Sequence, residues 1–366
     1  MKAVIVSSSY SYLERVELLK EYYEKKGYDT TVLLTDFIHA NKSCATWKRE
    51  GYVLVKTKAY KKNISVARLY SHYKFAKDVE KQLKNMEADV LHVLLPANSL
   101  TKVAKKYKEE HPDVKLYLDI IDLWPETMPI NRFKNAYPFQ KWRKLRDDNL
   151  DNANRIYCEC NLFAQVMNKE TDERFKTLYW VKTDEPVVSN PKLCTTELHL
   201  CYLGSINNVI DIDYIVSMCE ELSKYKNVVL HIVGDGEKRE ELLQKLRETN
   251  AKVIYHGLVY ELEKKQEIFD RCHFGLNIMK SSVCVGLTMK SLDYFQAGLP
   301  IINNIDGDTA EMIDAYKIGY NGYHALMDNI QELESNDYLA MRNCVKQLYY
   351  KKFTKEAFLK RLEEND

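Results

Sequence analysis

Short apolar runs alternate along the chain with longer segments in which apolar residues recur every three or four positions. The short runs are typical of buried strands, and the longer spacing is typical of amphipathic helices. In the first half we expect strands at 3–6, 30–34, 52–55, 90–94, 114–118, 155–158 and 177–180, with helices at 12–26, 65–85, 99–110 and 140–151. This alternation predicts a mostly parallel sheet covered by helices.

The second half repeats the alternation after a segment, 183–196, that holds two prolines and no periodic apolar pattern. We expect strands at 198–203, 228–233, 253–255, 274–278 and 299–302, helices at 213–224, 238–249 and 261–270, and a helical tail at 336–364. A chain of 366 residues is long for one core. The pattern therefore predicts two domains joined by the proline-containing linker.

Several expected strands of the second half end in glycine. Gly204 follows the run LHLCYL, Gly234 follows the next run, and Gly257 comes directly after His256. The carboxyl edge of this sheet would carry backbone N–H groups with little side-chain bulk, and open α/β sheets bind ligands at that edge. A phosphate or sugar could approach Gly204 and Ser205 closely because Gly204 has no Cβ, although strand ends also use glycine for turning alone.

Two neighbouring features leave their roles open. The run VGDGEKREEL, 233–242, lacks the last glycine of a dinucleotide-binding fingerprint because Arg239 occupies that position. Structural turning is therefore its simpler interpretation. His256 could donate to a phosphate or a sugar hydroxyl at the end of its strand, or it could be a satisfied structural residue.

The stretch 283–304, VCVGLTMKSLDYFQAGLPIINN, predicts a loop, a helix, a glycine stop and a strand. A helix that begins beside Gly286–Thr288 offers unpaired N–H groups and the positive end of its dipole, which suit a phosphate. Lys290 would add a charge in the first turn, and Asp293, one turn later on the same face, could accept two ribose hydroxyls. The alternative is an ordinary helix in which Lys290 and Asp293 pair with each other.

The segment LDIIDLWPETMP places Asp119, Asp122 and Glu126 around Trp124-Pro125, directly after an expected buried strand. Because proline disfavours helix at the preceding residue, this segment is predicted to be an extended loop at the sheet edge. The carboxylates could hold the hydroxyls of an acceptor, and Trp124 could stack on a sugar. Alternatively, the loop is packed by its own tryptophan, and the carboxylates are exposed or cap backbone groups.

A basic and aromatic segment runs from Asn131 to Arg146, with six Lys and Arg residues interleaved with four aromatic ones. It could rest on an anionic membrane surface or grip the diphosphate of a lipid carrier. It could equally be a solvated helix face with aromatic residues in the core. Nucleic acid is a weaker hypothesis, because the chain has a net charge of only +1 and lacks a basic track elsewhere.

Cysteine usage and hydropathy narrow the expected cellular location of the protein. The nine cysteines are scattered, and Cys158 and Cys160 form only C-x-C without a second pair at zinc spacing, so reduced cytosolic thiols are expected. The first apolar run is too short for a signal peptide. No window approaches the ~20 apolar residues of a membrane span. We expect a cytoplasmic protein, attached to the inner membrane face at most peripherally.

Five segments, taken together and in order, resemble glycosyltransferase family four, in the branch that builds bacterial capsule, exopolysaccharide and O-antigen chains. They are DIIDLWPE (119–126), YLGSI (202–206), VGDGEKREEL (233–242), VIYHGLV (253–259) and MKSLDYFQAGLPIIN (289–303). The resemblance implies the α/β fold called GT-B, with two Rossmann-like domains whose parallel sheets face a cleft, and C-terminal helices that cross back. It implies an acceptor-binding domain at 1–185, a nucleotide-sugar-binding domain at 186–350, and a last helix at 351–366 that packs on the N-terminal domain.

The same resemblance implies a retaining transfer, without a metal or other cofactor, of a hexose or N-acetylhexosamine from a nucleoside diphosphate to a lipid-linked saccharide. Carried over by position, the residues at the donor phosphates would be Gly204, Ser205, Lys290 and the N–H groups of Gly286, Leu287 and Thr288. Asp293 stands where the family has a ribose-binding glutamate, and His256, Leu258 and Val259 would frame the base. Asp122 and Glu126 would belong to the acceptor side, and together with Lys290 they are the expected catalytic residues.

Two positions depart from the family pattern. Val285 stands where the family has the first of two glutamates eight positions apart, and Ser205 stands where it often has arginine. The phosphate charge would therefore rest on Lys290 and on helix N-termini. The missing glutamate raises two alternatives on the same fold, a non-catalytic partner that stabilises another transferase and a nucleotide-sugar epimerase.

Overall fold

The computed structural model describes residues 1–62, 65–128, 136–192, 194, 196–330 and 336–366. The chain forms two compact units, one made of Met1–Tyr179 with Leu359–Asp366 and the other of Trp180–Phe358. The sequence-based boundary after residue 185 falls a few residues inside the second unit of this division.

The first unit contains a seven-stranded parallel sheet in the order β5-β2-β1-β6-β7-β8-β9. Its strands are β1 (Lys2–Ser7), β2 (Asp29–Thr35), β5 (Tyr52–Val55), β6 (Val90–Leu95), β7 (Lys115–Ile120), β8 (Arg155–Cys158) and β9 (Phe175–Thr177), and a small antiparallel pair joins β3 (Phe37–Ile38) to β4 (Ser43–Cys44). The helices are η1 (Tyr10–Tyr12), α1 (Leu13–Lys25), α2 (Val66–Leu83), α3 (Ser99–Glu110), α4 (Tyr137–Asp147) and α5 (Asn161–Val166), and the end of α13 (Lys355–Asn365) completes the unit.

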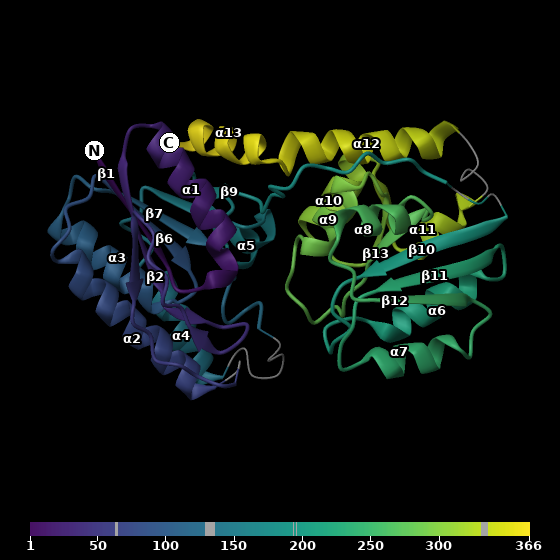
Figure 1. The fold of residues 1–366 in the computed structure, drawn as a ribbon, viewed down its shortest axis with the longest axis horizontal. Coiled ribbons are helices and arrows are strands. Elements are labelled where there is room, and N and C mark those ends of the chain that lie inside the picture. Colours follow the sequence, from purple (N-terminus) through teal and green to yellow (C-terminus); the bar gives the residue numbers. More distant parts are fainter. Residues whose placement is uncertain (63–64, 129–135, 193, 195, 331–335) are drawn as a thin grey trace. The chain divides into compact units, whose positions relative to one another are not determined.

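Helices cover both faces of this sheet, with α2, α3 and α4 along one face and α1 on the other (Figure 1). Strand β6 is consequently buried along its whole length, as expected of a parallel strand between two helical layers. A buried ion pair ties α1 to β7, because Arg15 Nε donates to Asp119 Oδ2 at 2.7 Å. Asp119, the second-to-last residue of β7, therefore has a structural partner inside the core.

The second unit contains a six-stranded parallel sheet in the order β12-β11-β10-β13-β14-β15. Its strands are β10 (Glu197–Leu203), β11 (Asn227–Val233), β12 (Lys252–Gly257), β13 (Phe274–Asn277), β14 (Ile301–Asn303) and β15 (Gly319–Asn321). Its helices are α6 (Ile212–Leu222), α7 (Arg239–Leu246), α8 (Leu262–Phe269), α9 (Met289–Gln296), α10 (Asp308–Tyr316), α11 (Tyr323–Met327) and α12 (Asn336–Lys352).

Each sheet reverses its strand order once, between β1 and β6 in the first unit and between β10 and β13 in the second. In each unit, the loops that leave the carboxyl ends of the two strands at the reversal run to opposite faces of the sheet, so a crevice opens between these loops. Open α/β sheets bind their ligands in this crevice. The topology therefore gives one candidate site to each unit.

The structure differs from the sequence-based expectation in the tail and in the last strand of the first unit. The expected helix at 336–364 is two helices, because Phe353 is fully buried and Thr354 Oγ1 accepts from the N–H of Ala357, which starts α13 anew. The last strand is Phe175–Thr177 instead of 177–180. Elements α10, β15 and α11 occupy a stretch for which the pattern gave no elements.

Candidate functional site

The crevice of the second unit brings together two residues that are distant in the sequence. Gly204 follows β10 with φ +121°, and a Cβ at this position would lie 3.7 Å from Cε of Lys290 in the first turn of α9. The Lys290 ammonium lies 4.4 Å from the centroid of the Tyr202 ring, at a distance that gives a cation–π contact. The structure thus places the predicted cation directly beside the predicted glycine turn.

Close backbone packing shapes the Gly204 turn. Gly234 has φ +141°, and a Cβ there would lie 2.0 Å from the carbonyl oxygen of Gly204. A Cβ at Gly236 would lie 2.3 Å from the carbonyl oxygen of Ile206 in the same way. The 233–242 segment therefore serves as a packing surface for the Gly204 turn, in agreement with its interpretation as a structural turn.

Two tyrosine hydroxyls hold the turn in place. The Tyr202 hydroxyl donates to the carbonyl oxygen of Ser205 at 2.9 Å, and the Leu203 N–H donates to the Tyr294 hydroxyl at 2.8 Å. Tyr294 comes from α9 and also donates to the carbonyl oxygen of Cys201 at 3.0 Å. Tyr294 consequently joins α9 to the end of β10, Tyr202 closes the turn that follows, and Ser205 itself remains exposed.

Helix α9 begins where the sequence predicted a phosphate-binding site. Thr288 is its N-cap, with extended φ and ψ, and its Oγ1 accepts from the N–H of Ser291 at 3.2 Å. The same hydroxyl donates to Oδ1 of Asn277 at the end of β13 at 2.8 Å, and the carbonyl oxygen of Gly286 accepts from Thr309. These bonds fix the loop through Gly286, Leu287 and Thr288 against the sheet.

Burial lowers the pKa of Lys290 to about 8. Packing against Tyr202 removes water from the ammonium, although part of the residue's surface stays accessible. Within the described chain Lys290 forms no ion pair, so its charge is available to a ligand. A desolvated lysine of this kind is suited to an anion that restores the missing charge.

Asp293 lies one turn beyond Lys290 but contacts other groups. Its Oδ1 lies 3.0 Å from Nζ of Lys182 and 3.2 Å from Nζ of Lys265. The pair between Lys290 and Asp293 that was the alternative interpretation of this helix does not form, since both lysine partners come from elsewhere. Both contacts use the same oxygen, which leaves Oδ2 as an acceptor.

The residues predicted to frame the base lie at the end of β12 and directly after it. His256 stacks on His231, with ring centroids 5.2 Å apart, and its Nε2 lies 3.0 Å from Nδ1 of His231. Leu258 is exposed over 59% of its surface, and Val259 is half-buried. The exposed Leu258 offers an apolar contact beside a glycine with φ +68°, Gly257.

The crevice of the first unit contains a cavity of about 120 Å³ at the ends of β1, β2 and β6. Hydroxyl, imidazole and aromatic groups dominate its lining, which consists of Ser8, Ser9, Ser11, Tyr12, Thr35, Phe37, His39, Thr57, Tyr60, Arg68, Ser71, His72, Phe75, Pro96, Asp122 and Trp124. Such a mixture of hydrogen-bonding groups and flat rings suits a saccharide. Asp122 and Trp124, predicted from the sequence, lie in this lining.

Asp122 is held at the cavity by Tyr12, whose hydroxyl donates to Oδ2. Burial raises the pKa of the Asp122 carboxyl, and the hydrogen bond from Tyr12 and the nearby charge of Arg68 oppose that effect without cancelling it. The carboxyl group is therefore a strong acceptor in a poorly solvated place.

Trp124 forms one wall of the cavity with a cation above it. Its ring stacks on His72, with centroids 5.6 Å apart and planes within 10°, and the Arg68 guanidinium lies 4.3 Å from the Trp124 ring centroid. Burial, with the charge of Arg68, lowers the pKa of His72 to about 3. His72 Nδ1 and Ser71 Oγ are buried and have no hydrogen-bond partner in the described part of the chain. Two buried polar atoms at a cavity wall indicate a place for a polar ligand.

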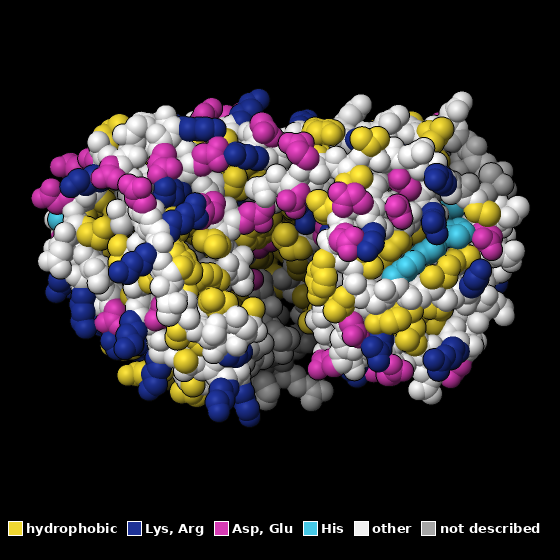
Figure 2. Space-filling view, viewed as in Figure 1, with side chains coloured by type: hydrophobic (Ala, Val, Ile, Leu, Met, Phe, Trp, Pro, Cys, Tyr) yellow, Lys and Arg dark blue, Asp and Glu magenta, His cyan; other side chains and the backbone are white. Residues whose placement is uncertain are grey.

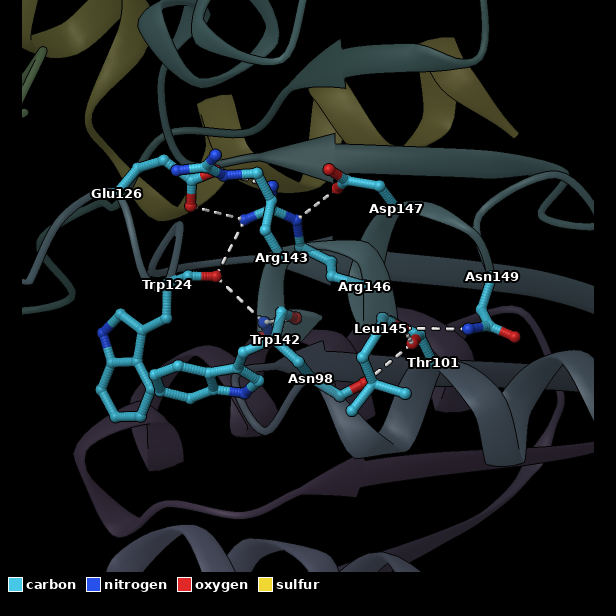
Figure 3. A network of polar contacts seen from close by, with 10 residues as sticks. All are labelled: Asn98, Thr101, Trp124, Glu126, Trp142, Arg143, Leu145, Arg146, Asp147 and Asn149. Atoms are coloured by element: carbon cyan, nitrogen blue, oxygen red, sulfur yellow. Dashed lines mark hydrogen bonds and ion pairs between the residues drawn. The ribbon is translucent and has the colours of Figure 1, made fainter. Parts of the chain in front are cut away.

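Glu126 belongs to a different environment, shown in Figure 3. Its carboxylate is paired with Arg146, at 3.0 Å from Nη1, and with Arg143, at 2.7 Å from Nε. Arg146 also donates to the carbonyl oxygen of Trp124 at 3.0 Å. Burial raises the pKa of the Glu126 carboxyl. The two guanidinium groups lower it by more than burial raises it, so the net shift is downward. Glu126 anchors the loop to α4 and does not line the cavity.

The basic and aromatic segment is described only in part, because residues 129–135 lie outside the described chain. Its remainder forms α4, where Tyr137 is exposed over 74% of its surface. A groove of about 780 Å³ runs beside α4, and its lining includes Tyr73, Lys102, Tyr137, Lys141, Trp142 and Lys144. No helix in the described chain is both long and apolar enough to cross a membrane.

The sequence did not point to Tyr12, Arg68 or His72 as parts of a site. Tyr12 ends η1, and the other two lie on α2, whose apolar spacing is that of an ordinary amphipathic helix. Their common place in the cavity depends on packing between elements. Only the polar residues on the buried side of α2, Ser71 and His72, were an available signal.

Comparisons with known proteins place these features in context. Residues 197–336, within the second unit, match the family model described as Glycosyl transferases group 1. No curated protein sequence matches the chain.

Solved structures resemble the whole chain. The apo form of the lipopolysaccharide outer core galactosyltransferase WaaB has 13% identity and a TM-score of 0.67, over 100% of this chain and 99% of its own. Sucrose-phosphate synthase from Thermosynechococcus elongatus has 11% identity and a TM-score of 0.68, over 100% and 98%. Anabaena Alr3699/HepE in complex with UDP and glucose has 10% identity and a TM-score of 0.63, over 100% and 98%. The expected α/β GT-B fold, with two Rossmann-like units and parallel sheets, is therefore confirmed.

Proposed function

We propose that this chain is a glycosyltransferase that moves a sugar from a nucleoside diphosphate to a saccharide acceptor. The observation that carries the proposal is the Lys290 ammonium beside the Gly204 turn, at the point where the strand order of the second unit reverses. Glycine without a Cβ, a helix start and an unpaired cation together suit a diphosphate. The match of residues 197–336 to a glycosyltransferase family model supports this assignment.

The donor is proposed to bind along the carboxyl edge of the second sheet. Lys290, the Gly204–Ser205 turn and the N–H groups after Gly286 would hold the two phosphates. Asp293 would accept ribose hydroxyls through Oδ2, because Lys182 and Lys265 both contact Oδ1. His256, Leu258 and Val259 would frame the base.

The acceptor is proposed to bind in the hydroxyl-lined cavity of the first unit. Trp124 would stack on a sugar face, and Asp122 would accept a hydrogen bond from the reacting hydroxyl. The buried Nδ1 of His72 and Oγ of Ser71 would bond to further hydroxyls. Glu126, predicted as a third catalytic residue, would act through the position of Trp124, because two arginines occupy its carboxylate.

The chemistry is proposed to be a retaining transfer without a metal. The bond from the sugar carbon to the phosphate oxygen breaks, and the acceptor oxygen bonds to that carbon on the same face. The acceptor proton passes to the departing phosphate oxygen. Lys290 and the helix start would stabilise the charge that develops on the leaving diphosphate, which is usually a large part of such catalysis.

A lipid-linked acceptor in surface polysaccharide synthesis is the finer proposal. The groove beside α4 presents Lys102, Lys141 and Lys144 next to exposed Tyr137 and Tyr73. Cationic and aromatic groups in one groove suit an anionic lipid surface or a lipid diphosphate. This would place the protein at the inner face of a membrane through α4.

Calorimetric titration with UDP, GDP, ADP and the phosphate-free nucleosides tests the proposal. We expect one diphosphate to bind and its nucleoside to bind far more weakly, because the phosphates make the main contacts. A donor sugar of the same nucleotide should then raise the melting temperature. No heat with any diphosphate would contradict the proposal and favour the non-catalytic partner suggested by Val285.

A further inference from the structure

Three histidines form a continuous row across the second sheet. His199 lies on β10, His231 on β11 and His256 on β12, and Figure 2 shows a stripe of histidine side chains on this part of the surface. His199 Nδ1 lies 2.9 Å from His231 Nε2, and His231 Nδ1 lies 3.0 Å from His256 Nε2. Each ring therefore uses one nitrogen to hold the next ring along the row.

The row ends at a group of three different donor atoms. His199 Nε2 lies 3.0 Å from Oε2 of Glu197 on the same strand. The Sγ of Cys194, three positions before that glutamate, belongs to the same group, and the three donor atoms all lie within 4.8 Å of one another. A thiol, a carboxylate and an imidazole nitrogen consequently lie close together at the start of β10.

We propose that Cys194, Glu197 and His199 form a binding site for a divalent cation of the Zn²⁺ class. Zn²⁺ is held in proteins by cysteine sulfur, imidazole nitrogen and carboxylate oxygen, and a water completes its four ligands where the protein supplies three. The thiolate and imidazole select against Mg²⁺ and Ca²⁺, which take oxygen ligands. The site lies in the second unit and takes no part in the chemistry of the proposed transfer, although His256 of the row is also a proposed contact of the base.

The histidine row supports this site by positioning its nitrogen ligand. A histidine that binds a metal through one nitrogen normally has its other nitrogen held by a hydrogen bond, which fixes the ring. His231 supplies that bond to His199, and His256 in turn fixes His231. His231 is almost fully buried, so the His199 ring is backed by a rigid neighbour.

Cation binding would tie the segment before β10 to the strand itself. Cys194 hydrogen-bonds Thr196 and precedes the first residue of β10, Glu197. As the bond from Sγ to the cation forms, the thiol proton is released to the solvent. A cation that binds the folded chain only would also raise its melting temperature.

The test is a titration of the full, chelator-treated chain with Co²⁺, followed by displacement with Zn²⁺. We expect a thiolate-to-cobalt absorption band that Zn²⁺ abolishes. Cys194→Ser should remove the band, and His199→Gln should weaken the Zn²⁺ affinity by more than about tenfold. Cys44→Ser is the matched control, since Cys44 is an exposed thiol in the first unit, and it should bind as the native chain does.

His231→Gln separates support from ligation. It should keep the thiolate band and weaken the Zn²⁺ affinity by about 10- to 100-fold, because the His199 ring loses its fixed partner. Melting curves without metal identify any variant that fails to fold, and Cys194→Ser, at a partly exposed position, tests the site without disturbing the core. The proposal is overturned if the native chain gives no thiolate band, or if the band survives in Cys194→Ser.

Discussion

The ammonium of Lys290 lies 4.4 Å from the centroid of the Tyr202 ring, at the end of the strand that leads into Gly204. An aromatic face attracts a cation without neutralising it. The Tyr202 ring therefore holds the ammonium in place. No carboxylate is needed for this, and a carboxylate would compete with a diphosphate for the ammonium.

Replacing Lys290 by alanine should lower the rate of sugar transfer. If its ammonium stabilises the leaving diphosphate, loss of that contact costs about 10²- to 10³-fold in kcat. Steady-state kinetics with the donor found by titration measures the effect. Lys264→Ala, on the exposed side of α8, is the control and should leave kcat unchanged. Equal rates in the two variants would remove Lys290 from the site.

The pH dependence of nucleotide binding should reflect the lowered pKa of Lys290. Diphosphate affinity should fall as pH rises through about 8, because the free protein then loses the charge. For stability the sign is opposite, since an unfolded lysine keeps its proton up to ~10.4. The contribution of this group to folding therefore improves from about pH 8 to about pH 10.4. Calorimetry from pH 7 to 9.5 measures the binding effect.

Lys290→Arg provides the comparison for that experiment. A guanidinium stays charged throughout this range. Its nucleotide affinity should be nearly independent of pH, whatever its absolute value. A slope in the arginine variant equal to that of the native chain would mean that another group titrates.

Alanine at Gly234 should disrupt the Gly204 turn. Its Cβ would lie 2.0 Å from the carbonyl oxygen of Gly204, and φ is +141° at this position. Gly27→Ala is the matched control, because Gly27 has φ +81° and open space around it, and backbone strain alone costs about 1–2 kcal/mol. Urea denaturation should show a larger loss for Gly234→Ala. Similar losses would argue against close packing of the two turns.

Asparagine at Asp122 should affect the acceptor and spare the donor. A hydrogen bond to a charged group is worth about 1.5–3 kcal/mol, which corresponds to a fall of about 10- to 100-fold in kcat/KM for the acceptor. The diphosphate dissociation constant should not change, because Asp122 belongs to the first unit. Asp113→Asn, at an exposed position, is the control. A parallel loss of nucleotide affinity would contradict the proposed division of roles.

Removal of Arg146 should destabilise the first unit far more than removal of Arg143. The Arg146 side chain is exposed over only 1% of its surface, and its loss leaves Glu126 poorly compensated in the interior, at a cost of about 3–5 kcal/mol. Arg143 is exposed over 29%, and a pair of that kind contributes below about 1 kcal/mol. Denaturation of Arg146→Ala and Arg143→Ala compares the two. Equal effects would mean that the carboxylate depends on neither arginine in particular.

The sequence predicted the limits of helices and strands best where those limits were clearly marked by the residue types. Strand Tyr52–Val55, helix Ser99–Glu110 and strand Arg155–Cys158 have the expected limits, because polar or turn-forming residues bound each of them. The division of the C-terminal tail into two helices was harder to predict, since its apolar spacing continues through Phe353 although the helix is interrupted there. A buried phenylalanine looks the same in sequence whether it sits inside a helix or at a break.

The sequence pointed to candidate site residues one by one, but the contacts between them could not be predicted. Gly204 and Lys290 were both expected near phosphate, since each stands at a characteristic position of a strand end or a helix start. The ring of Tyr202 below the ammonium depends on how β10 packs against α9, which no local pattern encodes. For the same reason the ion pairs that Glu126 forms with Arg143 and Arg146, both from α4, were not predicted.

Each reversal of strand order lies within one unit, so the loops that would select the donor and those that would select the acceptor are encoded in separate stretches of the gene. Mutations that remodel Ser8, Arg68 or Trp124 leave the interlocked Gly204 and Gly234 turns untouched. Recombination near the codons for 180–196 could therefore give an inherited donor preference a new acceptor. This arrangement would let a lineage diversify its glycans one linkage at a time.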